Sequence, residues 1–365
     1  MSLEPARLRP ARERPSAEGK VGSLVQAIGL WLVAVLVLPG CAGELTSSHT
    51  PPALLTRVST LPHSDSYCVV FSPGGTHLAS AGLHAVKIWD WPRQTLVRSL
   101  EVPKQSKISC VAFTGDGKHI LAGMNDGSIR VWEVLTGVAL DPFLGHESYV
   151  RSVICLPGSS RVVSCGLDTT IRVWDFRSRK EIRRLKGHTD WVLDIASCAN
   201  GRSIASVGLD RKVYLWNLAL GTSDGGRPTM DDPVSVDLAR DGCSVGYATR
   251  SALVVFPVGK GQGSRWVRKS KSFVRSIAFS PDGRLILSGS GDGEVAGAKV
   301  TWRDCSVRLW NAETGEELAC MTAHKTPVKD VGFSPNGNHA ASCGDTVVVW
   351  RVTDAGKEDR DHRVR

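Results

Sequence analysis

The feature of this sequence that most constrains its fold is a repeated apolar-x-apolar-Trp unit. The unit reads IRVW from Ile129 and again from Ile171, and VYLW from Val213. Its tryptophans are Trp89, Trp132, Trp174, Trp216, Trp310 and Trp350. The first three spacings are 43, 42 and 42 residues, and the last is 40. A fixed period in this range indicates a repeat architecture in which each repeat buries its apolar surface against its neighbours.

A spacing of 94 residues, from Trp216 to Trp310, contains a further unit. The segment SALVVFPVG places Phe256 in the tryptophan position, 40 residues after Trp216. The next spacing, 54 residues, exceeds the period, and the excess corresponds to an insertion at 292–304. The chain therefore contains seven units, six with tryptophan and one with phenylalanine.

Each unit has the same internal order, which the sixth unit illustrates. An alternating strand, VRSIAF, is followed by the turn sequence SPDG. A second strand (RLILSGS), a strand that carries the tryptophan (SVRLWN) and an outer strand (EELACMTAH) complete the unit. Four short strands in a period of about 40 to 45 residues are typical of a β-propeller blade.

These units resemble the WD40-repeat family over about residues 54–353. The dipeptides that carry the resemblance are Trp-Asp, at Trp89-Asp90 and Trp174-Asp175, and Gly-His, at Gly145-His146 and Gly187-His188. The resemblance implies an all-β, seven-bladed WD40-type propeller. It also implies a hydrogen-bonded tetrad inside a blade, carried in two units by His146, Ser164, Asp168 and Trp174 and by His188, Ser206, Asp210 and Trp216.

The recurring His, Ser and Asp side chains also suggest a catalytic interpretation. We expect a structural role instead, because the group recurs in successive blades together with the tryptophan. Buried polar groups need partners, and a fully connected network fixes a turn to a strand. The sequence contains no Gly-x-Ser-x-Gly, His-Glu-x-x-His or phosphate-binding loop motif. It therefore predicts a protein that is not an enzyme and has no catalytic residues.

A ring of blades leaves an exposed edge unless its last blade is completed. After Trp350 the chain becomes charged and contains no outer strand, whereas Leu54 to His63, LLTRVSTLPH, aligns with the outer strand EELACMTAH. We expect this N-terminal segment to supply the outer strand of the last blade. The propeller is thus predicted at 54–353, followed by a charged tail at 354–365.

The segment before the propeller predicts export. A basic stretch precedes an apolar run that ends in Leu38-Pro39-Gly40-Cys41, which resembles the lipobox of bacterial lipoproteins. The resemblance implies a signal peptide at 1–40, lipid on Cys41 and a tether at 41–53 that anchors the protein in the envelope. Ala42, where Asp would favour retention in the inner membrane, favours the outer membrane. The alternative is an uncleaved anchor helix, which would export the same residues.

Charge and cysteine content argue against two further classes. The net charge of +9 is spread without a basic stripe, so we expect no nucleic-acid partner. The cysteines other than Cys41 show no Cys-x-x-Cys spacing, so we expect no metal and no cofactor, and we interpret most of them as buried thiols in strands.

The resemblance also implies a binding surface on the top face, where each first strand begins and the turn aspartates lie. The residues at the corresponding positions are Tyr149, Trp191, Phe273, Arg151, Arg275, Lys329, Tyr67, Leu167 and Leu209. Exposed aromatic and arginine side chains commonly form interface hot spots. The alternative is that some of them only pack between blades.

The sequence thus predicts a lipid-anchored, non-catalytic scaffold in the bacterial envelope, facing the periplasm. It would be a monomeric ring that binds a protein partner on its top face. The alternative is a propeller that binds a small ligand or acts as an enzyme through its central channel, for which the strand starts offer only Asp65 and Asp232 as acids. A third hypothesis is a cytoplasmic scaffold.

Overall fold

A computed structural model of the chain describes residues 54–259, 263–296 and 299–353. The predicted signal peptide (1–40), tether (41–53) and charged tail (354–365) lie outside these residues, as does Cys41. The described residues form strands and turns and contain no helix. Accordingly, no helix among them could cross a membrane.

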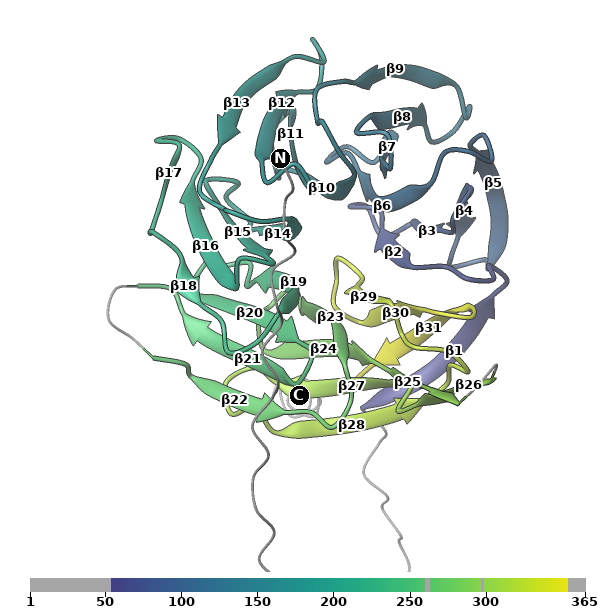
Figure 1. The fold of residues 1–365 in the computed structure, drawn as a ribbon. Helices are drawn as coiled ribbons and strands as arrows, with labels where there is room; N and C mark the ends of the chain where they lie inside the picture. The colour runs from purple at the N-terminus through teal and green to yellow at the C-terminus, as the bar shows by residue number, and fades with distance from the viewer. Residues whose placement is uncertain (1–53, 260–262, 297–298, 354–365) are drawn as a thin grey trace, which may run out of the picture. The chain divides into compact units, whose positions relative to one another are not determined.

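Figure 1 shows seven antiparallel sheets arranged around a centre, each a blade whose first strand is innermost. Blade 1 contains β2 (Cys68–Phe71), β3 (His77–Ala81), β4 (Ala85–Asp90) and β5 (Thr95–Glu101). Blade 2 contains β6 (Ile108–Phe113), β7 (His119–Met124), β8 (Ile129–Glu133) and β9 (Ala139–Phe143). Blade 3 contains β10 (Val150–Cys155), β11 (Arg161–Gly166), β12 (Ile171–Asp175) and β13 (Glu181–Leu185).

Blade 4 contains β14 (Val192–Ser197), β15 (Ser203–Gly208) and β16 (Lys212–Asn217), with β17 (Thr222–Ser223) and β18 (Arg227–Pro228) both paired to β16. Blade 5 contains β19 (Pro233–Leu238), β20 (Ser244–Thr249), β21 (Ala252–Pro257) and β22 (Trp266–Lys269). Blade 6 contains β23 (Val274–Phe279), β24 (Leu285–Ser290), β27 (Ser306–Asn311) and β28 (Glu317–Thr322). The predicted insertion in blade 6 forms a separate hairpin of β25 (Asp292–Ala296) and β26 (Lys299–Arg303).

Blade 7 contains strands from both ends of the propeller. Its inner strands are β29 (Asp330–Phe333), β30 (His339–Cys343) and β31 (Val347–Val352), and its outer strand is β1 (Leu55–Leu61). The two chain ends pair antiparallel, with Leu55 opposite Val352 and Leu61 opposite Val347. This pairing gives β31 a hydrogen-bonded neighbour on both sides, so it is not an open edge.

The apolar core is divided into seven clusters, each between two successive blades. The cluster at the closure, for example, combines Leu61 and Val349 of blade 7 with Val69, Leu78 and Trp89 of blade 1. The tryptophan of each such strand packs against the preceding blade, and the two apolar residues before it pack against the next blade, which is the physical reason for the repeated apolar-x-apolar-Trp pattern. A blade cannot bury this surface alone, so the units are stable only as an assembled ring.

The turn between the first and second strands ends in a glycine with positive φ in six of the seven blades, such as Gly283 in SPDG at +72° and Gly117 in TGDG at +69°. In blade 3 the turn is LPGS, and the positive-φ glycine, Gly158, stands one residue earlier. This conformation strains residues with a Cβ atom. These seven turns lie at one end of the first strands, and the opposite ends of the first strands form the candidate site.

Candidate functional site

The inner strands surround a central channel with a cavity of about 750 Å³. Its lining comes from the first strand of all seven blades, from the residues just before these strands and from Leu83, between the second and third strands of blade 1. We call the end of the channel at which the first strands begin the channel mouth. It is lined by Tyr67, Leu83, Lys107, Tyr149, Arg151, Phe273, Arg275 and Lys329.

β-bulges at the channel mouth position several of these side chains. In five blades the first strand carries one extra residue near its start, and in blades 3 and 6 that residue is Arg151 and Arg275. Ser109, Leu193 and Val234 occupy the same place in blades 2, 4 and 5. An unpaired extra residue locally reorients its side chain relative to the strand. Both arginines belong to the lining of the cavity.

The structure brings six of the nine predicted top-face residues together around the cavity: Tyr67, Tyr149, Arg151, Phe273, Arg275 and Lys329. Trp191 is 47% exposed and lies outside the cavity lining. Leu167 and Leu209 are half-buried, and their backbone N–H groups donate to the carbonyls of Tyr149 and Trp191, both at 2.9 Å. These two leucines hold the segments that carry the exposed aromatic residues.

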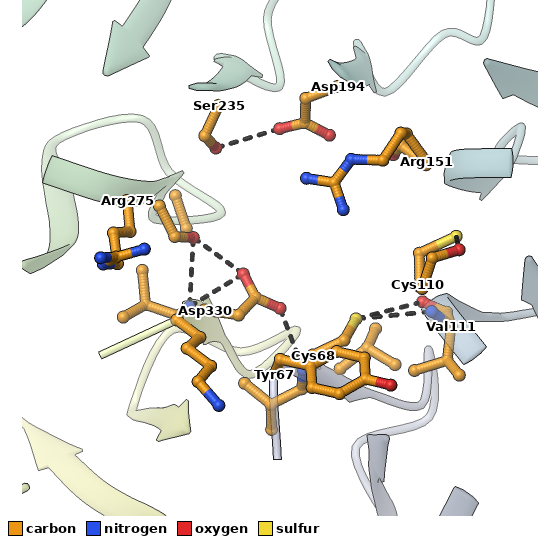
Figure 2. Close-up of a pocket in the computed structure, with 18 of the residues that line it drawn as sticks. Tyr67, Cys68, Cys110, Val111, Arg151, Asp194, Ser235, Arg275 and Asp330 are labelled. Carbon is orange, nitrogen blue, oxygen red and sulfur yellow. Dashed lines mark hydrogen bonds between the residues drawn. The ribbon is translucent and has the colours of Figure 1, made fainter. Parts of the chain in front are cut away.

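The basic side chains at the mouth contact aromatic rings and backbone. The guanidinium of Arg275 lies 4.8 Å from the Phe273 ring centroid, and its Nε donates to the Gly291 carbonyl at 3.1 Å. The ammonium of Lys329 lies 5.7 Å from the Tyr67 ring, within cation–π range. The Tyr67 hydroxyl donates to the Ile108 carbonyl at 2.6 Å. Figure 2 shows Arg151 extending into the pocket, whereas the guanidinium of Arg275 lies at its edge.

Three carboxylates also line the channel, and the sequence analysis did not identify them. They are Asp194 in β14, Asp237 in β19 and Asp330 in β29. The two acids that the sequence places at the strand starts, Asp65 and Asp232, are absent from the lining. Asp65 and Asp232 precede the first strands, whereas the three channel aspartates lie within them, where the inward-facing side chains line the cavity.

Each channel aspartate joins neighbouring blades, and Figure 2 shows Asp194 and Asp330. Asp330 accepts from the Val69 N–H of blade 1 at 2.9 Å and from the Ser276 hydroxyl of blade 6 at 2.8 Å. Asp194 accepts from the Ser235 hydroxyl and the Val236 N–H of blade 5, both at 3.0 Å. These contacts occupy the carboxylate oxygens with donors from adjacent first strands.

Burial controls the charge of these carboxylates. Burial raises the pKa of Asp237 to about 7, although the N–H groups of Phe279 and Leu238 oppose it. Burial likewise raises the pKa of Asp330 to about 6 and raises the pKa of Asp194. Removing a carboxylate from water disfavours its ionised form. Burial therefore reduces the negative charge of the channel wall near neutral pH, more at Asp237 than at Asp330.

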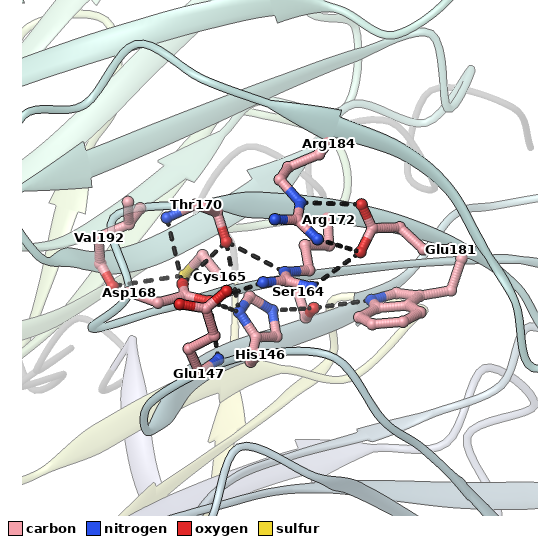
Figure 3. A network of polar contacts seen from close by, with 11 residues as sticks. His146, Glu147, Ser164, Cys165, Asp168, Thr170, Arg172, Glu181, Arg184 and Val192 are labelled. Atoms are coloured by element: carbon pink, nitrogen blue, oxygen red, sulfur yellow. Dashed lines mark hydrogen bonds and ion pairs between the residues drawn. The ribbon is translucent and has the colours of Figure 1, made fainter.

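The tetrads predicted for blades 3 and 4 form hydrogen-bonded chains in the structure. In blade 3, His146 Nδ1 lies 2.8 Å from Asp168, His146 Nε2 lies 2.7 Å from Ser164 Oγ, and the Trp174 indole donates to Ser164 Oγ at 2.8 Å (Figure 3). The fully buried Arg172 extends this network to Asp168 at 3.1 Å and to Glu181 at 2.8 Å.

In blade 4, the chain of His188, Ser206, Asp210 and Trp216 has contacts of 2.8 to 2.9 Å. Burial lowers the pKa of His188, although Asp210 opposes it, so the imidazole is neutral at neutral pH. The His188 Nδ1–H then donates to Asp210, and Nε2 accepts from the Ser206 hydroxyl. Every polar atom of the chain has a structural partner.

Blade 7 carries a third tetrad that the sequence analysis missed. His324 contacts Asp345 at 3.1 Å and Ser342 at 2.8 Å, and Trp350 donates to Ser342 at 2.9 Å. Its Ser and Asp are three residues apart rather than four, and Ala323 replaces the glycine of the Gly-His signal. The spacing of 18 residues from His to Ser is common to all three tetrads and would have identified it.

The nine described cysteines are free thiols. Seven are buried or half-buried, in line with the burial expected for most of them, whereas Cys243 and Cys320 are exposed. Burial raises the pKa of Cys110 in the channel wall to about 11, which disfavours the reactive thiolate. Within the described ranges, no group of His, Cys, Asp and Glu side chains could hold a metal ion.

Comparison with known proteins identifies the family. The model of the WD domain, G-beta repeat matches residues 55–90, 94–133, 137–175, 179–217, 267–311 and 315–351. The chain belongs to this WD40 family. The model leaves blade 5 unmatched, although the structure shows a complete four-stranded sheet there. Propellers of this family mostly act as non-catalytic protein-interaction scaffolds.

Three relatives show how far the similarity extends. WD repeat-containing protein VIP3 of Arabidopsis thaliana is 33% identical over 29% of this chain and 37% of its own length. Transducin beta-like protein 3 of Bos taurus is 33% identical over 33% of this chain and 13% of its own length. Periodic tryptophan protein 2 of Arabidopsis thaliana is 24% identical over 75% of this chain and 25% of its own length. The chain thus matches well under half of each relative.

Proposed function

We propose that this protein is a non-catalytic scaffold that binds a protein partner on the face around the channel mouth. The observation that carries the proposal is the pair of exposed aromatic side chains on this face, Tyr149 at 38% and Trp191 at 47% exposure. Both occupy the same place in adjacent blades, and both are held by backbone hydrogen bonds to the turn that bears the tetrad aspartate. Large, pre-positioned aromatic rings give much contact area at low entropic cost.

We further propose that the propeller is delivered to the bacterial envelope as a monomer and anchored by lipid on Cys41, facing the periplasm and favouring the outer membrane. The support is the sequence Leu38-Pro39-Gly40-Cys41 after a basic and apolar leader. Metabolic labelling with a palmitate analogue should mark the wild-type protein and leave a Cys41→Ala variant unlabelled and larger by the uncleaved leader. Equal labelling of both proteins would contradict the anchor without affecting the proposed binding face.

Affinity capture after cross-linking tests the binding face. The Tyr149→Ala, Trp191→Ala double variant should lose the partner that the wild-type protein retains, by at least about tenfold, since interface hot-spot residues cost about 2 kcal/mol or more when truncated. A matched control is the Leu135→Ala, Leu220→Ala double variant, because these two leucines are more exposed but lie away from the mouth.

All variants must first show wild-type melting. Loss in the control variant as well, or retention in the aromatic variant, would contradict the proposed face. Retention by the aromatic variant combined with loss on changing channel residues would instead favour a channel ligand.

A further inference from the structure

The charge pattern of the channel mouth indicates the charge of the ligand that it can bind. Four basic side chains from four blades, Lys107, Arg151, Arg275 and Lys329, line the opening. Among the residues that the structure describes, no carboxylate forms an ion pair with any of the four. Asp292 influences Arg275 through its charge alone. The mouth therefore carries positive charge that the fold itself does not neutralise.

The acids of the channel do not cancel this charge. The carboxylate oxygens of Asp330 and Asp194 accept hydrogen bonds from backbone N–H and serine hydroxyl groups of adjacent blades. Burial also raises the pKa of both groups, that of Asp330 to about 6, which lowers but does not abolish their negative charge near neutral pH. A basic ligand would need carboxylates with free acceptor sites, and the contacts just described already occupy the oxygens of Asp330 and Asp194. The cations without an ion-pair partner and the occupied carboxylates together favour an anionic ligand.

The shape of the site favours a peptide segment over a membrane surface as the ligand. The four cations surround a hollow of about 750 Å³, and the aromatic rings of Tyr67, Tyr149 and Phe273 belong to the same lining. A bilayer is flat and cannot follow its headgroups into such a hollow. A peptide segment can place a charged side chain among the cations while its apolar atoms contact the rings.

We propose that the channel mouth binds an acidic segment of the partner protein, with an Asp or Glu side chain among Arg151, Arg275 and Lys329. This inference rests on the proposed function and specifies the chemistry of its partner. The guanidinium groups offer paired N–H donors to the carboxylate, and partial desolvation in the hollow strengthens each contact. Discrimination against a neutral side chain is the expected consequence.

Pools of random peptides about nine residues long, with the central position fixed as Glu, Gln or Lys, test the proposal on the full-length protein. The wild type should retain the Glu pool about tenfold better than the Gln pool, because a well-placed charge pair is worth on the order of one such factor. The preference should decline when NaCl is raised from about 50 to about 500 mM. Equal retention of the Glu and Gln pools, or a preference for the Lys pool, overturns the proposal.

Charge-matched variants locate the effect. The Arg151→Gln, Lys329→Gln double variant should retain the Glu and Gln pools equally. The Arg161→Gln, Arg202→Gln double variant removes the same charge from the opposite ends of the strands and should behave as the wild type. A loss of preference in this control would assign the effect to net charge and overturn the proposed site.

Partner capture separates the two proposals. If the partner is lost with Tyr149→Ala, Trp191→Ala but retained fully by Arg151→Gln, Lys329→Gln, the scaffold function stands and the acidic segment is wrong. If the Glu pool binds through the cations but the aromatic variant still captures the partner, the acidic site stands and the proposed role of Tyr149 and Trp191 as the hot spot is wrong.

Discussion

Blades 3 and 5 have the same strand pairing but fill their interiors differently. In blade 3 the indole of Trp174 donates to Ser164 within the tetrad. In blade 5 Phe256 and Tyr247 occupy the positions of the tryptophan and the serine, and their rings meet edge to face at 6.2 Å. The comparison teaches that the strand pattern and the turns define the blade, and that either a polar network or ring packing can fill it.

Blade 5 also fixes its outer strand to its neighbour. Trp266 in β22 is buried, and its indole donates to the Ala312 carbonyl of blade 6 at 2.9 Å. Arg268 donates to the Gly315 carbonyl, also in blade 6, at 2.7 Å. Where blade 3 stabilises itself through its own tetrad, blade 5 depends on contacts across the blade boundary.

The largest expected effect comes from removing the ring that replaces the tryptophan. Phe256→Ala should lower the free energy of unfolding by about 3–5 kcal/mol, since Phe256 is buried and no polar network remains to hold the strand. Urea unfolding followed by tryptophan fluorescence measures this loss. Leu220→Ala, at an exposed position in a turn of blade 4, should change the free energy of unfolding by less than about 0.5 kcal/mol. A loss below about 1 kcal/mol for Phe256→Ala would show that blade 5 does not depend on this packing.

The second prediction contrasts a carboxylate of blade 5, Asp237, with a carboxylate of blade 3, Asp168. The pKa of Asp237 in blade 5 is about 7 in the folded protein, because of burial, and so lies above that of the unfolded chain. Its neutral form therefore stabilises the fold fully below about pH 4, and this contribution is lost as the pH rises through about 7. Relative to Asp237→Asn, the wild type should lose on the order of 2 kcal/mol across that range.

Asp168 in blade 3 should show the opposite slope. Burial raises its pKa, but the hydrogen bond and charge of His146, with donors from Thr170 and Glu147, hold the pKa well below its ordinary value. Its contribution is therefore present above about pH 4 and is lost as the pH falls below that value. Unfolding free energies of Asp168→Asn and Asp237→Asn measured from pH 3 to 8 test both signs, and parallel slopes would refute the contrast.

A smaller effect should follow from Ser164→Ala in blade 3. The change leaves the Trp174 indole without its acceptor and should cost about 1–3 kcal/mol, the cost of an unsatisfied buried polar group. Ser206→Ala in blade 4 removes the same contact and should give the same loss. The expected loss is smaller than that of Phe256→Ala because the tetrad is only one part of a network that includes Arg172. Unchanged unfolding of both serine variants would mean that the tetrads contribute little stability.

The sequence predicted blade 3 in more detail than the channel, for physical reasons. The spacing of the tryptophans and Phe256 predicts where each blade lies, because every blade buries the equivalent strand. The dipeptide Gly145-His146 predicts a tetrad, because the turn between the tetrad serine and aspartate has the regular length in this blade. The tetrad of blade 7 was missed because its turn is one residue shorter. Asp194 and Asp330 look like isolated acids in apolar strands, and their inward direction depends on ring geometry. The bulges that present Arg151 and Arg275 leave no signal in residue spacing.

The pairing of β1 with β31 has a consequence for biosynthesis. A ribosome makes Leu55 first and Val352 last among the paired residues, so the ring cannot close until nearly the whole propeller has been synthesised. Until then β1 lacks its partner and the growing chain exposes an unpaired apolar edge, the kind of surface that associates with other chains. A chain that must also cross a membrane would need to remain unfolded, or be kept so by a chaperone, for that entire interval. The pairing that closes the finished ring thus leaves the nascent chain dependent on a chaperone to prevent association with other chains.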